Sequence, residues 1–313
     1  MKSKRQTAES KVKEIKRHTR KKYSAEEKIR IVIEEFDGLK PKVPARKSFW
    51  NKIPEKERHQ VVETALDKTE LSPRELAYHI TDRQGWFISE SSVYRILKER
   101  GLITSPAWIV MDAADEFKDK TVRVHQQWQT DFTYFKIIGW GWYYLATIMD
   151  DYSRYIITWE LCKNMESTDV MRVVGQAIEE TGLDESNRPR LLSNNGSCYV
   201  SNEFSKFIHD QKMGHVRGAP YHPQTQGKIE RYHRTMKNIV KLENYFYPDD
   251  LRAKLESFVN YYNNERYHES LKNVTPADVY FGRDLELISR RNEIKMKTIK
   301  ERRKKNQKIK ISA

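Results

Sequence analysis

The chain has 313 residues, 38% of them hydrophobic and 33% charged, with 7 Trp, 17 Tyr and 11 Phe. This length suits two domains, and so many aromatic residues exclude an intrinsically disordered chain. No stretch approaches the ~20 apolar residues of a membrane span, and the N-terminus lacks the apolar segment of a secretory signal. The two cysteines are too few for a disulfide framework. We therefore expect a globular cytoplasmic protein with no membrane partner.

The formal net charge of +14 is concentrated at the two ends of the chain. Residues 1–22 contain ten Lys and Arg against two Glu, and residues 283–313 contain twelve against four acidic residues, which is +8 in each case. The body between them, residues 23–282, is left with −2. A charge run is usually a solvated surface. Two basic arms on one chain nevertheless favour contacts with a phosphate backbone.

Helical patterns follow the basic arm, which we assign to residues 1–23. One helix is predicted over residues 24–36, where Ser24 and Glu27 form a capping box, and another begins at Pro54. The apolar stripe of this second helix would consist of Val61, Val62, Ala65 and Leu66. These helices open a region that we take to extend from residue 24 to residue 103.

Two short helices in the second half of that region fit a helix-turn-helix. Ser72 and Glu75 form a capping box around Pro73 for a helix over residues 73–80, and a helix over residues 90–100 follows. As a recognition helix, the latter would offer DNA its outward side chains, which are Ser91, Ser92, Tyr94, Arg95 and Lys98. A generic helical hairpin is the competing interpretation, and this pattern alone does not separate the two.

After a predicted linker, residues 104–127, the periodicity becomes that of a sheet. Residues 128–137, 142–150 and 155–162 alternate as three strands, and helices then alternate with short strands. This order predicts an α/β fold, a ribonuclease H-like mixed sheet with flanking helices, preceded by the all-α region. In the first hairpin, Trp140 and Trp142 are interpreted as packing residues in preference to residues that stack on bases. We place this domain at residues 128–282 and a basic tail, which could extend as a helix, at residues 283–313.

Three polar positions carry the candidate chemistry. Asp131 lies in the first strand, Asn194 follows the fourth strand within LLSNNGSCY, and Glu230 lies in a long helix within PYHPQTQGKIER. Thirty-five residues lie between positions 194 and 230. Each alone has an ordinary explanation, since helical Glu is usually on the surface and Asn-Asn-Gly is typical of a turn. The three become informative only in this order and at this spacing.

The sequence from Trp128 to Gly282 resembles the insertion-sequence transposases that share the retroviral integrase catalytic core. In that family an Asp in the first strand, an Asp in a Ser-Asp-Asn-Gly motif and a Glu 35 residues later form the DDE triad. The segments DDYSRYI, PYHPQTQGKIER and YYNNERYHESLKNVTPADVYFG carry further resemblance. Several motifs in the right order are far more specific than any one of them. We leave Asp150 and Asp151 out of the catalytic set, because the family uses that segment structurally.

The resemblance implies metal-dependent cleavage and strand transfer of DNA. Asp131, position 194 and Glu230 would hold two Mg²⁺ ions, for which Mn²⁺ would substitute, because hard cations need oxygen ligands. The same helix offers phosphate contacts through Lys228, Arg231, Arg234 and Lys237. The partners would be the terminal inverted repeats of a mobile element, target DNA, and further copies of the chain as a dimer or higher oligomer on DNA. Such a protein would be associated with the bacterial nucleoid.

Position 194 departs from the family pattern, because SNNG replaces SDNG. Asparagine keeps the size of aspartate but loses its charge, so we expect a site that folds and a chemistry that drops by orders of magnitude. The substitution could be a deliberate inactivation, which the intact neighbouring residues favour, or a natural change. We therefore predict a DNA transposase that is catalytically impaired. The alternatives are a non-catalytic, transposase-derived DNA-binding protein and a ribonuclease or structure-specific nuclease.

Overall fold

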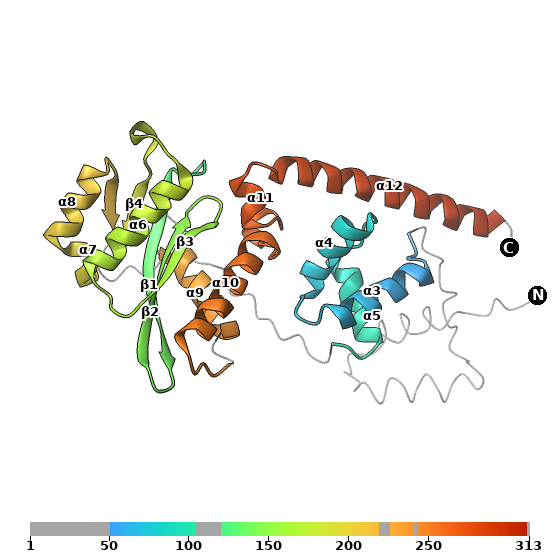
Figure 1. The fold of residues 1–313 in the computed structure, drawn as a ribbon. Coiled ribbons are helices and arrows are strands. Elements are labelled where there is room, and N and C mark those ends of the chain that lie inside the picture. Colours follow the sequence, from blue (N-terminus) through green and yellow to red (C-terminus); the bar gives the residue numbers. More distant parts are fainter. Residues whose placement is uncertain (1–50, 104–119, 219–225, 241–242, 312–313) are drawn as a thin grey trace, which may run out of the picture. The chain divides into compact units, whose positions relative to one another are not determined.

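The computed structural model describes residues 51–103, 120–218, 226–240 and 243–311 (Figure 1). The predicted helix over residues 24–36, the N-terminal basic arm and most of the predicted linker lie outside these ranges. All the described residues belong to one structural unit. Within the described part of the chain, no helix is long and apolar enough to cross a bilayer.

A five-stranded mixed sheet forms the centre of the second half of the chain, in the order β3-β2-β1-β4-β5. Its strands are β1 (Gln127–Ile137), β2 (Gly141–Asp150), β3 (Ile156–Cys162), β4 (Arg190–Ser193) and β5 (Gly214–Arg217). The first three form an antiparallel meander, whereas β4 runs parallel to β1 and β5 runs parallel to β4. This topology confirms the predicted ribonuclease H-like mixed sheet.

Helices cover both faces of the sheet, because alternate residues of each strand point to opposite sides. On one face, α6 (Ser167–Thr181), α7 (Ser197–Val200) and α8 (Asn202–Asp210) pack on Trp128, Ile148 and their neighbours. The N-cap of α6 is Glu166, which forms a capping box with Asp169.

The other face of the sheet is covered by α9 (Gly227–Val240) and α10 (Pro248–Asn264). Ile229, Tyr232 and Met236 of α9 are buried there against the meander. They recur every three or four residues, so that one side of α9 is apolar while Glu230 and Arg234 stay exposed. The buried side of α9 thereby fixes where its polar side lies.

Three short helices precede the sheet and share a small core of their own. They are α3 (Glu55–Asp67), α4 (Pro73–Gln84) and α5 (Glu90–Glu99). The predicted capping box of Ser72 and Glu75 is present at the start of α4. This helix continues one turn past its predicted end at Ile80, because Gly85, in the left-handed conformation, is the first residue able to end it. Leu66, predicted in the apolar stripe of α3, is 60% exposed.

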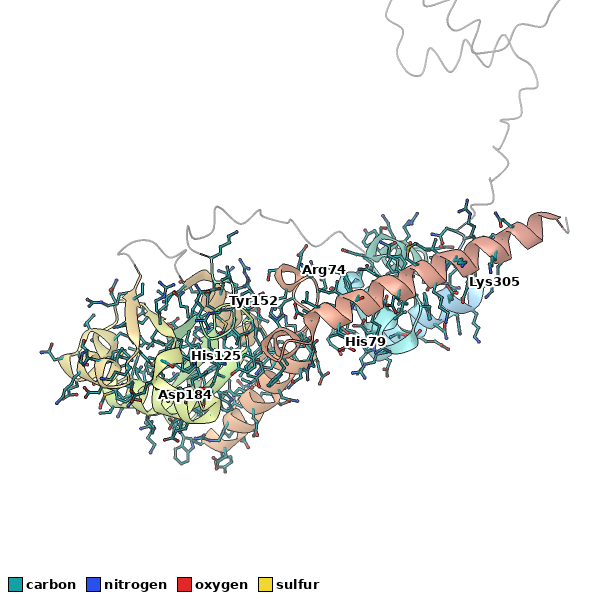
Figure 2. The ribbon with its side chains drawn as sticks, turned by 90° about the horizontal axis from the view of Figure 1, so that it is seen from above. Arg74, His79, His125, Tyr152, Asp184 and Lys305 are labelled. Atoms are coloured by element: carbon teal, nitrogen blue, oxygen red, sulfur yellow. The ribbon has the colours of Figure 1, made fainter. Side chains whose placement is uncertain are left out.

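The basic tail is a helix, α12 (Asp284–Ile311), which follows α11 (Pro276–Tyr280). Two of its cations are buried against the three short helices. The guanidinium of Arg291 lies 2.7 Å from a carboxylate oxygen of Asp82, and that of Arg302 lies 2.6 Å from Glu57. Other cations of α12, including Lys305, are exposed (Figure 2). The tail is therefore neither wholly solvated nor wholly available to a partner.

Candidate active site

The sheet and α9 bring the three predicted positions together. Asp131 lies in β1, Asn194 directly follows β4, and Glu230 lies in the first turn of α9. β1 and β4 are parallel neighbours in which Gln129 pairs with Leu192, so the residues two positions further along, Asp131 and Asn194, also lie side by side. The amide nitrogen of Asn194 donates a hydrogen bond to Oδ1 of Asp131 over 2.9 Å. Positions 63 residues apart in the sequence are thus in direct contact.

Both ends of the Asn194 amide have a partner. While its nitrogen bonds to Asp131, its oxygen accepts a hydrogen bond of 2.8 Å from the backbone N–H of Gly196. A Cβ atom at residue 196 would come within 2.9 Å of this same oxygen, so any other residue there would require the Asn194 side chain to shift. The amide nitrogen therefore occupies the position beside Asp131 that one carboxylate oxygen of an aspartate would take.

Glu230 is influenced by its neighbours although its side chain is exposed. Partial burial and the nearby charge of Asp131 raise the pKa of Glu230, and the cation of Arg234 opposes this shift. His233 is buried on the same helix, and its Nδ1 lies 3.4 Å from Oδ2 of Asp131. The two remaining carboxylates of the site are therefore close enough to interact electrostatically.

A network of buried polar side chains holds the start of α9 against the sheet. Gln226 donates hydrogen bonds to the carbonyl oxygens of Thr130 and Leu192, at 2.9 and 3.4 Å, and so connects β1 with β4. Gln129 accepts a bond from the N–H of Ile229. These contacts fix the helix that carries Glu230 relative to the strand that carries Asp131. Sequence reasoning missed both glutamines, although Gln226 lies one helical turn before Glu230.

Asp151 completes this network from the turn after β2. Its carboxylate accepts hydrogen bonds from Gln129 and from Thr121, both at 2.6 Å. The ammonium of Lys228 lies 2.7 Å from Oδ2 of Asp151 and also donates to its carbonyl oxygen. Lys228, predicted to contact DNA, is thus bound within the protein. Asp151 has the structural role that the sequence analysis assigned to it.

The other predicted DNA-contact residues lie on two helices. On α5, Ser91, Arg95 and Lys98 are exposed, whereas Ser92 and Tyr94 are partly buried. On α9, Arg231 and Arg234 are exposed and Lys237 is partly buried. Tyr221 and His222 of the PYHPQTQGKIER segment lie outside the described residues.

The interpretation of Trp140 and Trp142 as packing residues is wrong. The two side chains are 54% and 51% exposed, because the hairpin between β1 and β2 extends past the helices that cover the sheet. The turn itself is formed by Gly139 and Gly141, both with positive φ angles of 82° and 90°.

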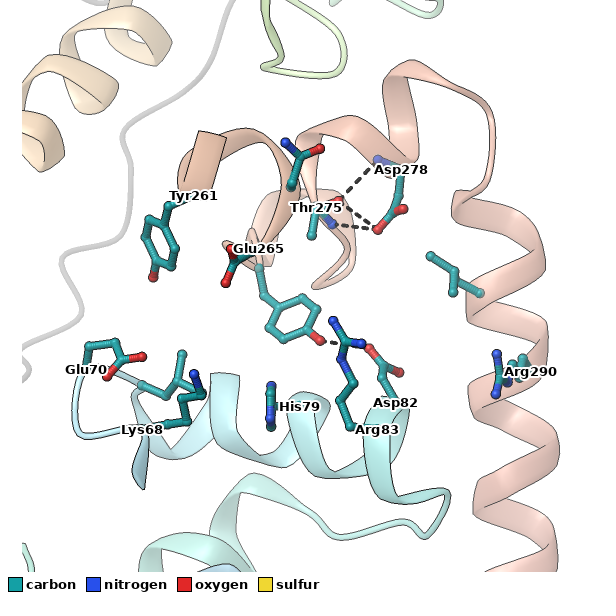
Figure 3. A pocket seen from close by; sticks show the side chains of 14 residues that line it. Lys68, Glu70, His79, Asp82, Arg83, Tyr261, Glu265, Thr275, Asp278 and Arg290 are labelled. Atoms are coloured by element: carbon teal, nitrogen blue, oxygen red, sulfur yellow. Dashed lines mark hydrogen bonds between the residues drawn. The ribbon is translucent and has the colours of Figure 1, made fainter. Parts of the chain in front are cut away.

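A pocket of about 290 Å³ lies away from the three positions, between α4 and residues of α10, α11 and α12 (Figure 3). Cations such as Lys68 and Arg83 share its lining with acids such as Glu70 and Asp82. Asp82 is already bound to Arg291 and to the hydroxyl of Tyr267. Because the lining contains both acidic and basic side chains, its charge indicates no particular ligand.

The donors at the three positions do not fit a pair of divalent cations as they stand. A two-ion site needs anionic oxygens on both ions. Here Asn194 directs an N–H toward Asp131, and its oxygen is bound to Gly196. In the described ranges, no group of three or more His, Cys, Asp and Glu residues is placed to hold a metal ion.

Comparisons with known proteins agree with this arrangement of strands and helices. Residues 121–223 and residues 211–276 match two family models, both described as integrase core domain. The Gag-Pro-Pol polyprotein of mouse mammary tumor virus (strain BR6) is 30% identical over 141 residues, 44% of this chain and 8% of the polyprotein. The Intracisternal A-particle Pol-related polyprotein of mouse intracisternal a-particle MIA14 is 33% identical over 120 residues, 38% of this chain and 13% of that protein. The chain thus spans a small part of these relatives.

Solved structures of integrases are also similar. A simian T-cell lymphotropic virus intasome in complex with PP2A regulatory subunit B56 gamma has a TM-score of 0.45 at 18% identity, covering 70% of this chain and 74% of that one. The HTLV-2 integrase catalytic core domain in complex with magnesium has a TM-score of 0.40 at 20% identity, covering 51% and 98%. The family models and the sequence relatives support an integrase-like core of the DDE type over residues 121–276.

Proposed function

We propose that this chain is an integrase-type transposase that binds the ends of a mobile DNA element, and that Asn194 prevents its metal-dependent cleavage and strand transfer. The integrase-like core supports polynucleotidyl transfer as the ancestral chemistry. In that reaction the oxygen of a water molecule or of a 3′-hydroxyl forms a bond to the phosphorus of a phosphodiester, and one bridging P–O ester bond breaks, so that its oxygen leaves as the hydroxyl of the released strand. The observation that carries the proposed impairment is the hydrogen bond from the Asn194 amide to Asp131.

DNA binding is proposed from two sets of exposed cations. Arg231 and Arg234 follow Glu230 on α9, so phosphates could lie along the helix from the catalytic positions. Arg95 and Lys98 project from α5, the predicted recognition helix of a helix-turn-helix. Two DNA ends must be joined in such a reaction, so we also propose that two or more copies assemble on DNA.

A non-catalytic, transposase-derived DNA-binding protein is the second candidate. The hydrogen bonds of Asn194 favour it, because its amide nitrogen and its amide oxygen both have protein partners and neither atom is directed at a cation site. Under this proposal the chain binds DNA and leaves the chemistry to another protein. Restoring the carboxylate at position 194 distinguishes the two candidates.

The test compares the wild-type chain with the Asn194→Asp variant on labelled linear DNA that carries candidate element ends, with Mg²⁺ or Mn²⁺. We expect nicking and strand transfer from the Asp variant alone. Asn195→Asp is the matched control, because it adds the same charge one residue away at an exposed side chain. In the active variant, Glu230→Gln should abolish turnover and leave DNA affinity nearly unchanged.

Two other outcomes have distinct meanings. If Asn194→Asp folds and binds DNA but produces neither nicks nor joined products, the non-catalytic candidate is favoured. If the variant cuts RNA–DNA hybrids instead of element ends, the chain is a nuclease on the same fold and the transposase proposal is wrong.

A further inference from the structure

The hairpin of β1 and β2 carries an aromatic surface that the proposed chemistry does not use. Tyr134 and Trp142 are each about half exposed, at 50% and 51%. Their rings meet edge to face, with centroids 5.4 Å apart. They are diagonal neighbours on one face of the hairpin, because Tyr134 pairs with Tyr144 and Trp142 pairs with Lys136. We call Tyr134, Lys136, Trp142 and Lys237 the hairpin surface.

Lysine side chains lie over both rings of the hairpin surface. Nζ of Lys237 is 4.7 Å from the centroid of Tyr134, and Nζ of Lys136 is 5.9 Å from that of Trp142. Residues 132–149 contain one Lys and no acidic residue, and residues 231–242 contain cations and no acidic residue. The surface is therefore both aromatic and positively charged, which is the combination that suits a nucleic acid strand.

The hairpin surface lies at a similar distance from the catalytic positions along two elements, β1 and α9. Tyr134 is three residues after Asp131 on β1, which is roughly 10 Å along a strand, and its side chain points to the opposite face of the sheet, so this route passes around the edge of β1. Lys237 is seven residues after Glu230 on α9, which is also roughly 10 Å along a helix. The two routes meet where Lys237 contacts the ring of Tyr134. A DNA strand that has a phosphate at Asp131 and Glu230 could therefore reach the hairpin surface about three nucleotides away.

The edge of β1 beside this route is open in the described part of the chain. β4 pairs with β1 only at residues 127–129, and the β1–β2 hairpin continues past it (Figure 1). The tip of the hairpin is held in place, since the N–H of Ile138 donates to the carbonyl of Tyr245, a buried residue before α10. The aromatic rings are thus exposed on a fixed support.

From these observations we infer that the hairpin surface stacks unpaired bases of the DNA strand that leads to the catalytic positions. This inference rests on the proposed DNA function and adds a subsite to it. Tyr134 and Trp142 provide the stacking faces, and Lys136 and Lys237 neutralise the adjoining phosphates. The occupant is a single-stranded or unpaired DNA end, because bases within a duplex have no free face for stacking.

The experiment measures binding of the full chain to two probes, a blunt duplex oligonucleotide and the same duplex with a single-stranded extension. A fluorescent purine analogue is placed at successive positions of the extension. We expect Trp142→Ala to weaken binding to the extended probe about tenfold and to the blunt duplex less than about twofold, as for the loss of one stacked base. Fluorescence quenching in the wild type should be strongest about three nucleotides from the end of the duplex and absent in Trp142→Ala.

Control variants separate stacking from other effects. Trp142→Phe keeps an aromatic face and should restore most of the affinity. Phe281→Ala is the matched control, because Phe281 is 58% exposed and lies beneath the cation of Arg283, yet it is far from Glu230 in the sequence. This control should bind both probes like the wild type.

Three results would overturn the inference. Equal losses on the two probes would show that Trp142 contributes to general DNA binding and not to base stacking. Self-association of the free chain that disappears in Trp142→Ala would show that the surface contacts a second copy. Failure of the wild type to bind even the blunt duplex would contradict the proposed DNA function itself. Binding of both probes with equal losses in Trp142→Ala would contradict only the stacking subsite.

Discussion

The neutral amide of Asn194 removes a negative charge from beside the carboxylate of Asp131. Asn194 donates a hydrogen bond to Asp131, so the carboxylate of Asp131 has a neutral partner at 2.9 Å. An aspartate in the same place would put two negative charges at hydrogen-bond distance, and such a pair is stable only with a cation or a shared proton. Asparagine therefore needs no cation beside Asp131, whereas aspartate would need a cation or a shared proton.

This difference predicts a change in stability as well as in activity. Without metal at neutral pH, Asn194→Asp should lower the free energy of unfolding by about 1–3 kcal/mol, because a hydrogen bond is replaced by repulsion. Added Mg²⁺ should raise the melting temperature of this variant and leave that of the wild type unchanged. Thermal denaturation with Mg²⁺ and with a chelator checks this. Equal responses to Mg²⁺ in the two proteins would contradict it.

His268 is predicted to make the fold sensitive to acid. Burial and the surrounding arginines lower its pKa to about 3 from an ordinary value of 6.5. The unfolded chain therefore takes up a proton near pH 6.5 while the folded chain does not, so stability falls as the pH decreases from about 6.5 toward 3. The slope contributed by His268 is at most about 1.4 kcal/mol per pH unit.

The pH dependence is tested with denaturant unfolding of the wild type and His268→Gln between pH 7.5 and 4. Glutamine does not titrate, so the variant should lose less stability over this interval than the wild type. Above pH 7 the offset between the two proteins should be constant, because both are then neutral at this position. Parallel curves throughout would show that His268 is protonated equally in the folded and unfolded chains.

At the scale of secondary-structure elements, the position of α9 depends on contacts with the turn after β2 and with β1. Asp151 is 4% exposed and accepts bonds from Lys228, Gln129 and Thr121. A buried carboxylate that loses one partner keeps its desolvation penalty without the compensating bond. The lysine therefore holds the start of α9 against the turn after β2.

We expect Lys228→Gln to lower the free energy of unfolding by about 1–3 kcal/mol, less than for a fully buried pair because Lys228 is partly exposed. The number of phosphates bound, measured as the dependence of DNA affinity on salt, should stay the same. Lys206→Gln on α8 removes an exposed cation and should leave stability unchanged. If the DNA affinity of Lys228→Gln depended less steeply on salt while its stability was unchanged, Lys228 would contact a DNA phosphate and would not act as a structural residue.

At the scale of the whole molecule, α12 contains two classes of cation. Arg291 and Arg302 are buried in ion pairs with α4 and α3, and the guanidinium of Arg302 also donates to the carbonyl of Phe87. Lys297, Lys304 and Lys305 are exposed. Removal of the whole tail would disrupt both classes at once, so substitutions are the sharper test of its role.

Changing Lys297, Lys304 and Lys305 together to Gln should flatten the salt dependence of DNA binding, with the slope falling by up to about 0.9 for each phosphate that is no longer neutralised. Stability should be unchanged. Arg302→Ala is the contrasting variant, which should be destabilised by roughly 3 kcal/mol because Glu57 loses its buried partner. An unchanged salt dependence in the triple variant would show that the exposed face of α12 is a solvated charge run.

The sequence by itself determined the elements and the three candidate positions. Strand alternation, the capping box at Ser72 and the glycine after α5 are local features, so they are readable without the fold. The order of three strands followed by alternating helices and strands was enough to predict the sheet. The interval between Asn194 and Glu230, together with the motifs around them, predicted the DDE-type core.

The tertiary structure alone decided which polar groups are already bound and which surfaces are free. Gln226 meets the carbonyl of Thr130 across 96 residues, and Arg291 meets Asp82 across 209. Lys228 looked like a DNA contact and is held by Asp151, whereas Trp142 looked like a core residue and is half exposed. The physical reason is that burial and pairing depend on distant segments meeting in space, and a periodic pattern reports only which side of an element is apolar.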